Sequence, residues 1–236
     1  WYLVCKTEIL SAYVLPPPEK VFRSFLKMLQ SGELARDIGI SFLRVLKGFA
    51  IAFVLAFVLG MFRALFPGIS GYYEHAVQFF RNVPPLSMIP LLILWLGIEE
   101  APKIAIVFLS GFFPIYMNAA TAVAGVDPKL IEAARTLKFT GRELFFKLTL
   151  PAALPGIVTG LRLGFGYCWR ALVGAELIAA SSGLGFLISE SGEFAKTDAV
   201  FVGIITIVVL GIAADALLRA LLKRVTPASA TEVQRV

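Results

Sequence analysis

Between two long apolar stretches the chain reads DPKLIEAARTLKFTGRELFFKLTLP, residues 127–151. Asp127 is suited to act as an N-cap and Pro128 to the first helical position, so a helix is predicted to begin there. Thr140 and Glu143 form a capping-box pattern that predicts a second short helix. The apolar faces of the two helices would comprise Leu130, Ile131, Ala134 and Leu137, and then Leu144, Phe145 and Leu148. Two short amphipathic helices of mixed charge between apolar spans form a docking surface for a soluble protein.

Composition places the chain in a membrane. Of its 236 residues 58% are hydrophobic and the mean hydropathy is +0.82, whereas soluble domains are roughly half apolar. The formal net charge of +6 also suits a nucleic-acid-binding protein, but the cations are spread among loops and span ends rather than gathered on one face. The positive-inside rule explains this distribution better, and nucleic acid is not an expected partner.

Several stretches are long enough to cross a bilayer, which requires about 20 apolar residues. They run from Ile38 to Met61, Tyr72 to Leu96, Pro102 to Val123, Ala152 to Ile178 and Ala199 to Leu222. Cations crowd the loop after the third stretch and follow the last one, so both regions are expected in the cytoplasm. These cations are Lys129, Arg135, Lys138, Arg142, Lys147, Arg219, Lys223 and Arg224. The segments 97–100 and 179–198 would then face outward.

This topology predicts an all-α polytopic membrane protein with three regions. Residues 1–36 would hold the outer end of a first span and an external amphipathic helix over Pro16 to Gly32. Residues 37–225 would form the transmembrane domain with a cytoplasmic loop at 125–150, and residues 226–236 a cytoplasmic tail. A cytoplasmic C-terminus after five spans puts the first residue outside. Because the chain also opens without an initiating methionine, we expect a sixth span to precede it.

Polar residues within the spans are candidates for function, since lipid does not tolerate them unpaired. Arg81 and Asn82 precede Pro84-Pro85, which must break or kink the second span because proline lacks a backbone donor. Arg81 would either hold a freed carbonyl, in a structural or gating role, or contact a substrate.

The fourth span carries two cations, Arg162 and Arg170. Arg162 lies toward the cytoplasmic end and is expected to pair with carbonyls or lipid phosphate. Arg170 has no acidic partner at helical spacing on its own helix, because Glu176 falls on a different face. A cation in this position suits an anionic substrate; the alternative is an ion pair with another helix or with a second subunit.

Small residues and turns complete the pattern. Gly156, Gly160 and Gly164 form a stripe that lets another helix approach closely, either of this chain or of a dimer mate. The run from Ser181 to Gly185 predicts an external turn leading into a short helix through Phe194. Neither a disulfide framework nor a zinc site or histidine triad is expected, because the chain has 2 cysteines and 1 histidine.

The order Glu132-Ala133-Ala134, then a glycine, then Leu150-Pro151 resembles the coupling motif of ABC-type importer permeases. That family usually has its glycine where this chain has Lys138, so Gly141 is expected to supply the turn. Further stretches extend the likeness over nearly the whole chain, at 81–85, 94–98, 113–116, 150–162 and 175–179. There the chain resembles the permeases of the nitrate, sulfonate and taurine importer group, and the aliphatic sulfonate permeases above all.

The resemblance implies the transmembrane-domain fold of type I ABC importers, in the cell inner (plasma) membrane. It implies a homodimer, two cytoplasmic ATPase subunits, a periplasmic or lipid-anchored substrate-binding protein and contact with membrane lipid. The chain has no GxxxxGK[ST] loop, so ATP and Mg would be bound by the ATPase subunits and this chain would be non-catalytic and hold no cofactor. The expected cargo is a small anion, sulfonate or taurine first, with nitrate, bicarbonate, another small anion or a vitamin precursor as alternatives. A secondary transporter would need acidic residues in the middles of the spans, which show none.

Two sets of site residues follow. The ATPase-coupling residues are Glu132, Ala133, Ala134, Arg135, Lys138 and Gly141. The substrate-pathway residues are Arg81, Asn82, Tyr116, Asn118, Trp169, Arg170 and Glu176. The resembling permeases are expected to have an uncharged residue in place of Arg170, so a cargo more strongly anionic than a monosulfonate is a further possibility.

Overall fold

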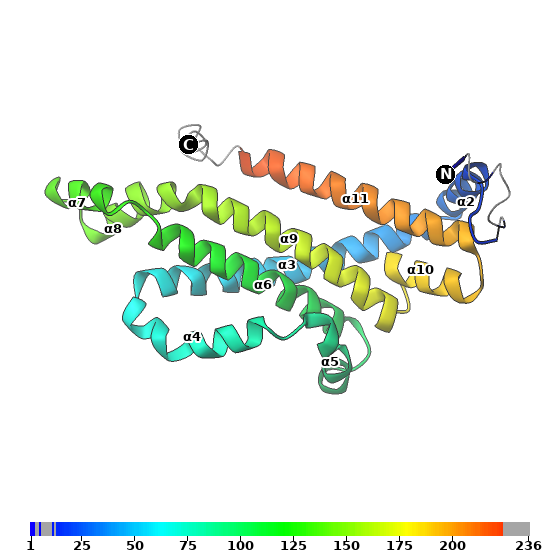
Figure 1. Cartoon of the computed structure of the whole chain (residues 1–236), viewed down its shortest axis with the longest axis horizontal. Helices are drawn as coiled ribbons and strands as arrows, with labels where there is room; N and C mark the ends of the chain where they lie inside the picture. The colour runs from blue at the N-terminus through cyan, green and yellow to red at the C-terminus, as the bar shows by residue number, and fades with distance from the viewer. Residues whose placement is uncertain (3–4, 6–10, 12, 224–236) are drawn as a thin grey trace. The chain divides into compact units, whose positions relative to one another are not determined.

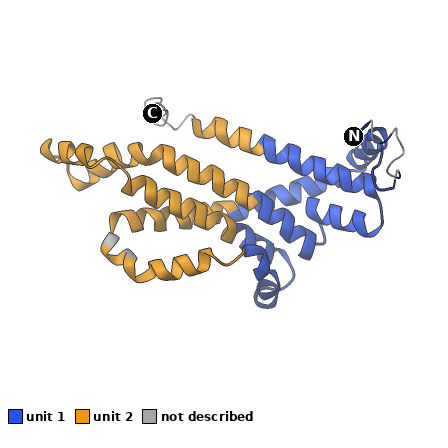
Figure 2. Ribbon diagram, in the orientation of Figure 1, with its two compact units in different colours: residues 1–48, 85–107, 169–213 blue, residues 49–84, 108–168, 214–236 orange. Residues whose placement is uncertain are grey.

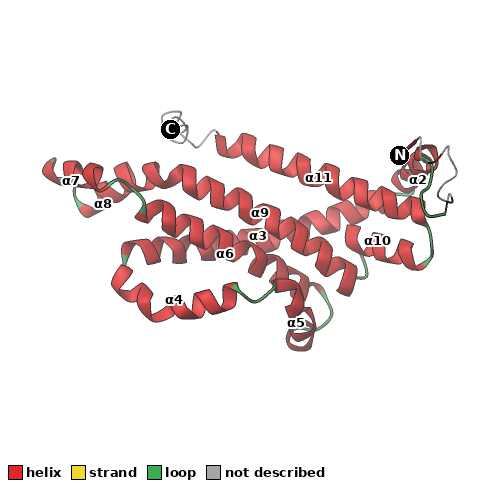
Figure 3. Cartoon of the chain, viewed as in Figure 1, coloured by secondary structure: helices red, strands yellow, loops and turns green. Residues whose placement is uncertain are grey.

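A computed structural model describes residues 1–2, 5, 11 and 13–223, and these residues form helices and short connections without strands (Figures 1 and 3). The helices in chain order are α2 (Pro18–Gln30), α3 (Glu33–Leu65), α4 (Pro67–Arg81), η1 (Pro85–Met88), α5 (Ile89–Leu96), α6 (Glu100–Ala124), α7 (Pro128–Thr136), α8 (Gly141–Glu143), η2 (Leu144–Thr149), α9 (Leu150–Ala179), α10 (Leu184–Glu193) and α11 (Thr197–Lys223). The predicted tail at 226–236 lies outside the described residues.

Four helical runs, which contain α3, α6, α9 and α11, are long and apolar enough to cross a membrane. The helices α3, α6, α9 and α11 themselves each begin and end within about five residues of a predicted span, because the length of an apolar stretch fixes the length of a spanning helix. The short helix predicted after Ser181–Gly185 is α10, with Phe194 as its C-cap.

The second predicted span, Tyr72 to Leu96, is broken. The segments Gly71–Arg81 and Pro85–Leu96 are bent by 85°, as the two prolines require. The side chain at the break that binds a backbone carbonyl is Asn82, whose Nδ2 donates to the Gln78 carbonyl at 2.7 Å. Arg81 is exposed, so the expected carbonyl contact is made by its neighbour.

Contacts divide the chain into two compact units, coloured in Figure 2. Unit 1 comprises Trp1–Gly48, Pro85–Val107 and Trp169–Ala213. Unit 2 comprises Phe49–Pro84, Phe108–Cys168 and Ala214–Val236.

In unit 2 the glycine stripe of α9 packs against α6 of the same chain. Residue spacing alone did not decide between a helix of this chain and one of a dimer mate. A Cβ at Gly156 would lie 2.5 Å from Ala122, one at Gly160 would lie 2.5 Å from Asn118, and one at Gly164 would lie 2.6 Å from Ile115. Helices approach this closely only where side chains are absent. The contact buries apolar residues of both helices, among them Ala119, Val123, Ala153 and Ile157.

In unit 1 the predicted amphipathic helix is α2. Its buried residues are Val21 and Met28, while the adjoining apolar residues Phe22 and Leu29 are 61% and 47% exposed. The face is therefore only partly covered within the described chain.

Candidate functional site

The predicted coupling helix is present as α7. Asp127 is its N-cap, with Oδ1 accepting from the Lys129 backbone N–H at 2.9 Å. Ala134 is buried, whereas Leu130 and Leu137 are 47% and 71% exposed. Glu132, Ala133 and Arg135 are also exposed. The described chain therefore leaves α7 with an outward surface of two leucines beside charged groups of both signs.

The turn that follows α7 is made by Lys138 and not by Gly141, which corrects the expectation from sequence. Lys138 has a φ of +58°, and Gly141 is the first residue of α8. The backbone N–H of Phe139 donates to Ala134 at 3.1 Å and that of Lys138 to Arg135 at 2.9 Å. This pair of bonds is a Schellman motif, whose left-handed residue is usually glycine. Lys138 thus adopts the left-handed conformation that a Schellman motif usually gives to glycine.

The capping box forms as predicted. Glu143 Oε2 accepts from the Thr140 backbone N–H at 3.1 Å, and the Glu143 N–H donates to Thr140 Oγ1 at 3.3 Å. Lys147 Nζ lies 2.8 Å from Glu143 Oε1. The hydrogen bonds from Lys147 and Thr140 lower the pKa of Glu143 to about 2, so this loop carboxylate stays ionised near neutral pH. The second coupling helix is not separate, however, because α8 passes through the π-helical turn η2 directly into α9.

A buried charge network lies in unit 1, centred on Arg44 of α3. Its Nη1 donates to Glu176 Oε1 and to the Ser182 carbonyl, both at 2.7 Å, and its Nε donates to Glu100 Oε2 at 2.6 Å. Glu176 also accepts from Ser41 Oγ at 2.8 Å. Glu176 is 1% exposed, and its carboxylate also accepts from the Gly185 backbone N–H at 2.9 Å. These contacts hold the α9–α10 turn, and a role for Glu176 in the substrate pathway stays a prediction.

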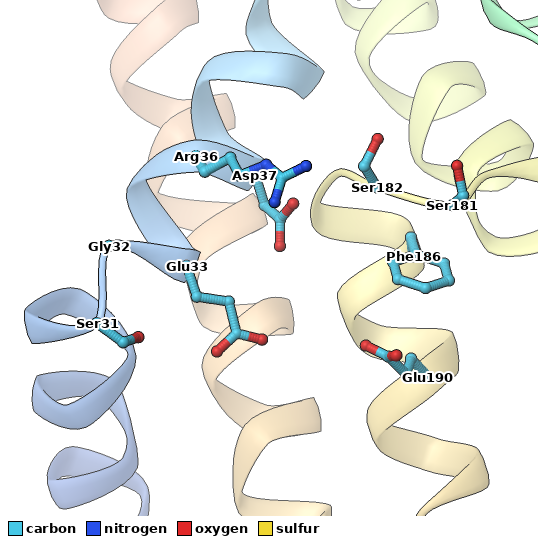
Figure 4. Close-up of a pocket in the computed structure, with 9 residues that line it drawn as sticks. All are labelled: Ser31, Gly32, Glu33, Arg36, Asp37, Ser181, Ser182, Phe186 and Glu190. Atoms are coloured by element: carbon cyan, nitrogen blue, oxygen red, sulfur yellow. The ribbon is translucent and has the colours of Figure 1, made fainter.

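A polar pocket of about 400 Å³ lies beside this turn in unit 1. Figure 4 shows the carboxylates of Glu33, Asp37 and Glu190 along the space between the start of α3 and α10. Asp37 Oδ1 accepts from the backbone N–H of Gly183 at 2.9 Å. Gly183 has a φ of +106°, a conformation that favours glycine.

Arg162 has a carboxylate partner, which sequence reasoning missed. Its Nη2 lies 3.3 Å from Asp215 of α11, and Asp215 also binds Arg219 at 2.7 Å. All three residues belong to unit 2. The expected partners were carbonyls or lipid phosphate. Asp215 could have suggested this ion pair from sequence, because it is an acidic residue within an apolar span.

Arg170 is exposed on α9 and interacts with another group of the chain. Trp169 is 6% exposed and packs beside Gly211, where a Cβ would lie 2.9 Å from its Nε1.

The remaining pathway residues lie in unit 2 with Arg81 and Asn82. Asn118 Nδ2 donates to the Pro114 carbonyl of its own helix at 2.8 Å. Tyr116 is 1% exposed and lies beneath the guanidinium of Arg63. Among the described residues no three His, Cys, Asp or Glu side chains form a group that could hold a metal ion.

Comparison with known proteins identifies the family. A family model described as "binding-protein-dependent transport system inner membrane component" matches residues 48–227. A putative aliphatic sulfonates transport permease of Bacillus subtilis is 38% identical over 221 residues, which are 94% of this chain and 80% of the relative. A taurine transport permease of Escherichia coli is 35% identical, over 96% of this chain and 84% of the relative. A nitrate import permease of Synechocystis is 27% identical, over 97% and 85%.

A solved structure supports the fold. The MetNI methionine ABC transporter, crystallised in inward-facing conformations, matches with a TM-score of 0.72 and 20% sequence identity, over 84% of this chain and 98% of the other. The predicted fold class, a type I ABC importer transmembrane subunit, is thereby confirmed.

Proposed function

The chain belongs to the inner-membrane components of binding-protein-dependent transport systems, and from this premise we propose that its cargo is a small organic sulfonate. As a permease subunit of an ABC importer it is non-catalytic, and ATP is hydrolysed by a separate subunit. The similarity to sulfonate and taurine permeases supports this cargo. The more distant similarity to a nitrate permease supports an inorganic anion as the alternative.

The proposed assembly is a homodimer of this chain with two ATPase subunits on the cytoplasmic side. The loop at 125–150 and the C-terminus would face the cytoplasm, because this loop and the end of α11 carry the cations that the positive-inside rule places there. The Figure 4 pocket would then face outward, toward the substrate-binding protein. Closure of the ATPase subunits on ATP would draw the two coupling loops together and reorient the spans by rigid-body motion.

The observation that carries the coupling assignment is the outward surface of α7. Exposed apolar patches bordered by charge mark protein interfaces, and Leu130 and Leu137 are exposed next to Glu132 and Arg135. Such a surface on a loop between spans fits a soluble subunit.

Glu132→Lys tests this assignment. Reversing one charge within an interface is expected to lower ATP-dependent uptake about tenfold or more, while the spans still insert. The measurement is uptake in proteoliposomes together with the amount of ATPase subunit that copurifies. Glu19→Lys, the same change on exposed α2, is the control and should keep wild-type uptake. Normal uptake with normal ATPase copurification in Glu132→Lys would remove α7 from the coupling interface.

A further inference from the structure

An apolar groove of about 590 Å³ lies in unit 1 between α2, α3 and α11. Ligand pockets in proteins have volumes of about 300–1,000 Å³. The side chains that form its two longer walls are Val21, Phe22 and Phe25 of α2 and Val202, Ile205 and Val209 of α11. Apart from Thr206 and Trp1, the lining side chains carry no polar atom. Because a bound water needs two to four polar partners, the groove requires an apolar occupant.

The groove follows a membrane span. Its α11 wall extends over residues 202–210, about 12 Å at 1.5 Å per residue, and α11 is a candidate span. On this wall Ile205 and Val209 are 43% and 57% exposed. At one end α2 is held to the start of α11, where Ser24 Oγ donates to Asp198 Oδ2 at 2.6 Å (Figure 1). An acyl chain parallel to α11 fits a groove of this shape.

The end of the groove beside α2 has the features of a membrane–water interface. Interfacial helices bury an apolar face at the boundary between headgroups and acyl chains, and Val21 and Phe25 of α2 face the groove. Trp1 lines the same end, with its ring stacked on Phe201 at 5.3 Å and its Nε1 donating to the Pro16 carbonyl at 3.0 Å. Tryptophan is enriched at this depth of a bilayer. A lipid in the groove would therefore have its headgroup beside α2.

The charge of α2 selects the headgroup. The helix has three cations, Lys20, Arg23 and Lys27, against one carboxylate, Glu19. Lys20 lies 3.8 Å from Asp198, while Arg23 and Lys27 are exposed one helical turn apart. Like charges at this spacing repel each other, and a phosphate between them would compensate both. Long cationic side chains reach the headgroup level from the polar face of such a helix.

We propose that the groove and α2 bind one anionic phospholipid, with an acyl chain along α11 and the phosphate at Arg23 and Lys27. The lipid covers the apolar face of α2 that the described chain leaves partly exposed. This site is independent of the cargo that the permease carries.

The test compares phosphatidylglycerol with phosphatidylcholine of the same acyl chains, each added to the purified permease–ATPase complex in detergent. A ligand that binds the folded state raises the unfolding temperature. We expect phosphatidylglycerol to raise the unfolding temperature of the permease more than phosphatidylcholine does. sn-Glycerol 3-phosphate, which has the phosphate without the acyl chains, should not raise it.

Two substitutions examine the headgroup contact. Arg23→Gln combined with Lys27→Gln should weaken phosphatidylglycerol binding about tenfold, because two cations near the phosphate are lost. The same variant should respond to phosphatidylcholine as wild type does. Glu19→Gln, on the same helix and also exposed, removes the opposite charge and should keep the preference for phosphatidylglycerol.

Val209→Trp examines the groove itself. Val209 is 57% exposed, so a larger side chain can extend into the groove without displacing buried residues, and most of the phosphatidylglycerol effect should disappear. Val208→Trp is the matched control, because Val208 is the preceding residue, is 53% exposed and lies outside the groove lining. It should keep the wild-type rise.

Three results would overturn the site. Equal rises with the two phospholipids would show that the headgroup charge is not recognised. An unchanged rise in Val209→Trp would show that the lipid binds elsewhere and that a second copy or another segment of the chain covers the groove. An equal rise with sn-glycerol 3-phosphate would indicate a site for a free anion. If the double Gln variant unfolds early without lipid, the comparison of Val209→Trp with Val208→Trp still decides.

Discussion

Lys138 shows how one backbone position constrains the coupling loop. A lysine with a φ of +58° carries a Cβ in a conformation that costs about 1–2 kcal/mol. The Schellman bonds at the end of α7 need this conformation, so the chain tolerates the strain. Sequence could identify Lys138 as the place where glycine is expected, but the sign of φ depends on hydrogen bonds that form only in the folded turn.

Lys138→Gly should therefore raise the free energy of unfolding by about 1 kcal/mol, because glycine adopts a positive φ without strain. Equilibrium unfolding in detergent measures this change. Lys138→Ala is the matched control, since alanine keeps the Cβ and should gain nothing. A loss of stability in the glycine variant would mean that the lysine side chain has a structural contact of its own.

The buried pair Arg44 and Glu176 lay beyond sequence reasoning for a related reason. The two residues are 132 positions apart, so helical spacing holds no information about their contact. The sequence analysis placed Glu176 in the substrate pathway, and only the packing of α3 against α9 in unit 1 shows that it pairs with Arg44.

Individual helices were the most predictable feature of the chain. Apolar length and proline position predicted α3, α6, α9, α11 and the break after Arg81. The capping residues Asp127 and Thr140 were equally predictable from sequence, because they bind backbone groups only a few positions away. What sequence left open was which helix packs on the glycine stripe, since close approach depends on two surfaces.

Gly160→Ala tests that packing. Its Cβ would lie 2.5 Å from Asn118, and overpacking of this kind is expected to cost about 1–3 kcal/mol. Gly71→Ala, in α4 of the same unit with no heavy atom within 4 Å, should be neutral or stabilising by about 0.5–1 kcal/mol. Equal effects of the two substitutions on the unfolding midpoint would contradict the packing of α6 on α9.

For the whole molecule, the orientation across the membrane is the first property to measure. In a background without Cys5 and Cys168, a cysteine at exposed Ser181 should react with an impermeant thiol reagent added outside intact cells. A cysteine at exposed Gly141 should react only after the membrane is opened. The opposite labelling pattern would invert the topology, and would move α7 away from the ATPase side.

The central claim is that this permease subunit carries a small sulfonate under the control of a separate ATPase. The most direct measurement is uptake of labelled sulfonate into proteoliposomes that contain the chain, its ATPase subunit and its loaded substrate-binding protein. Uptake should require ATP and all three components, and unlabelled nitrate should compete poorly. ATP-independent uptake, or sulfonate uptake that nitrate abolishes at equal concentration, would contradict the account.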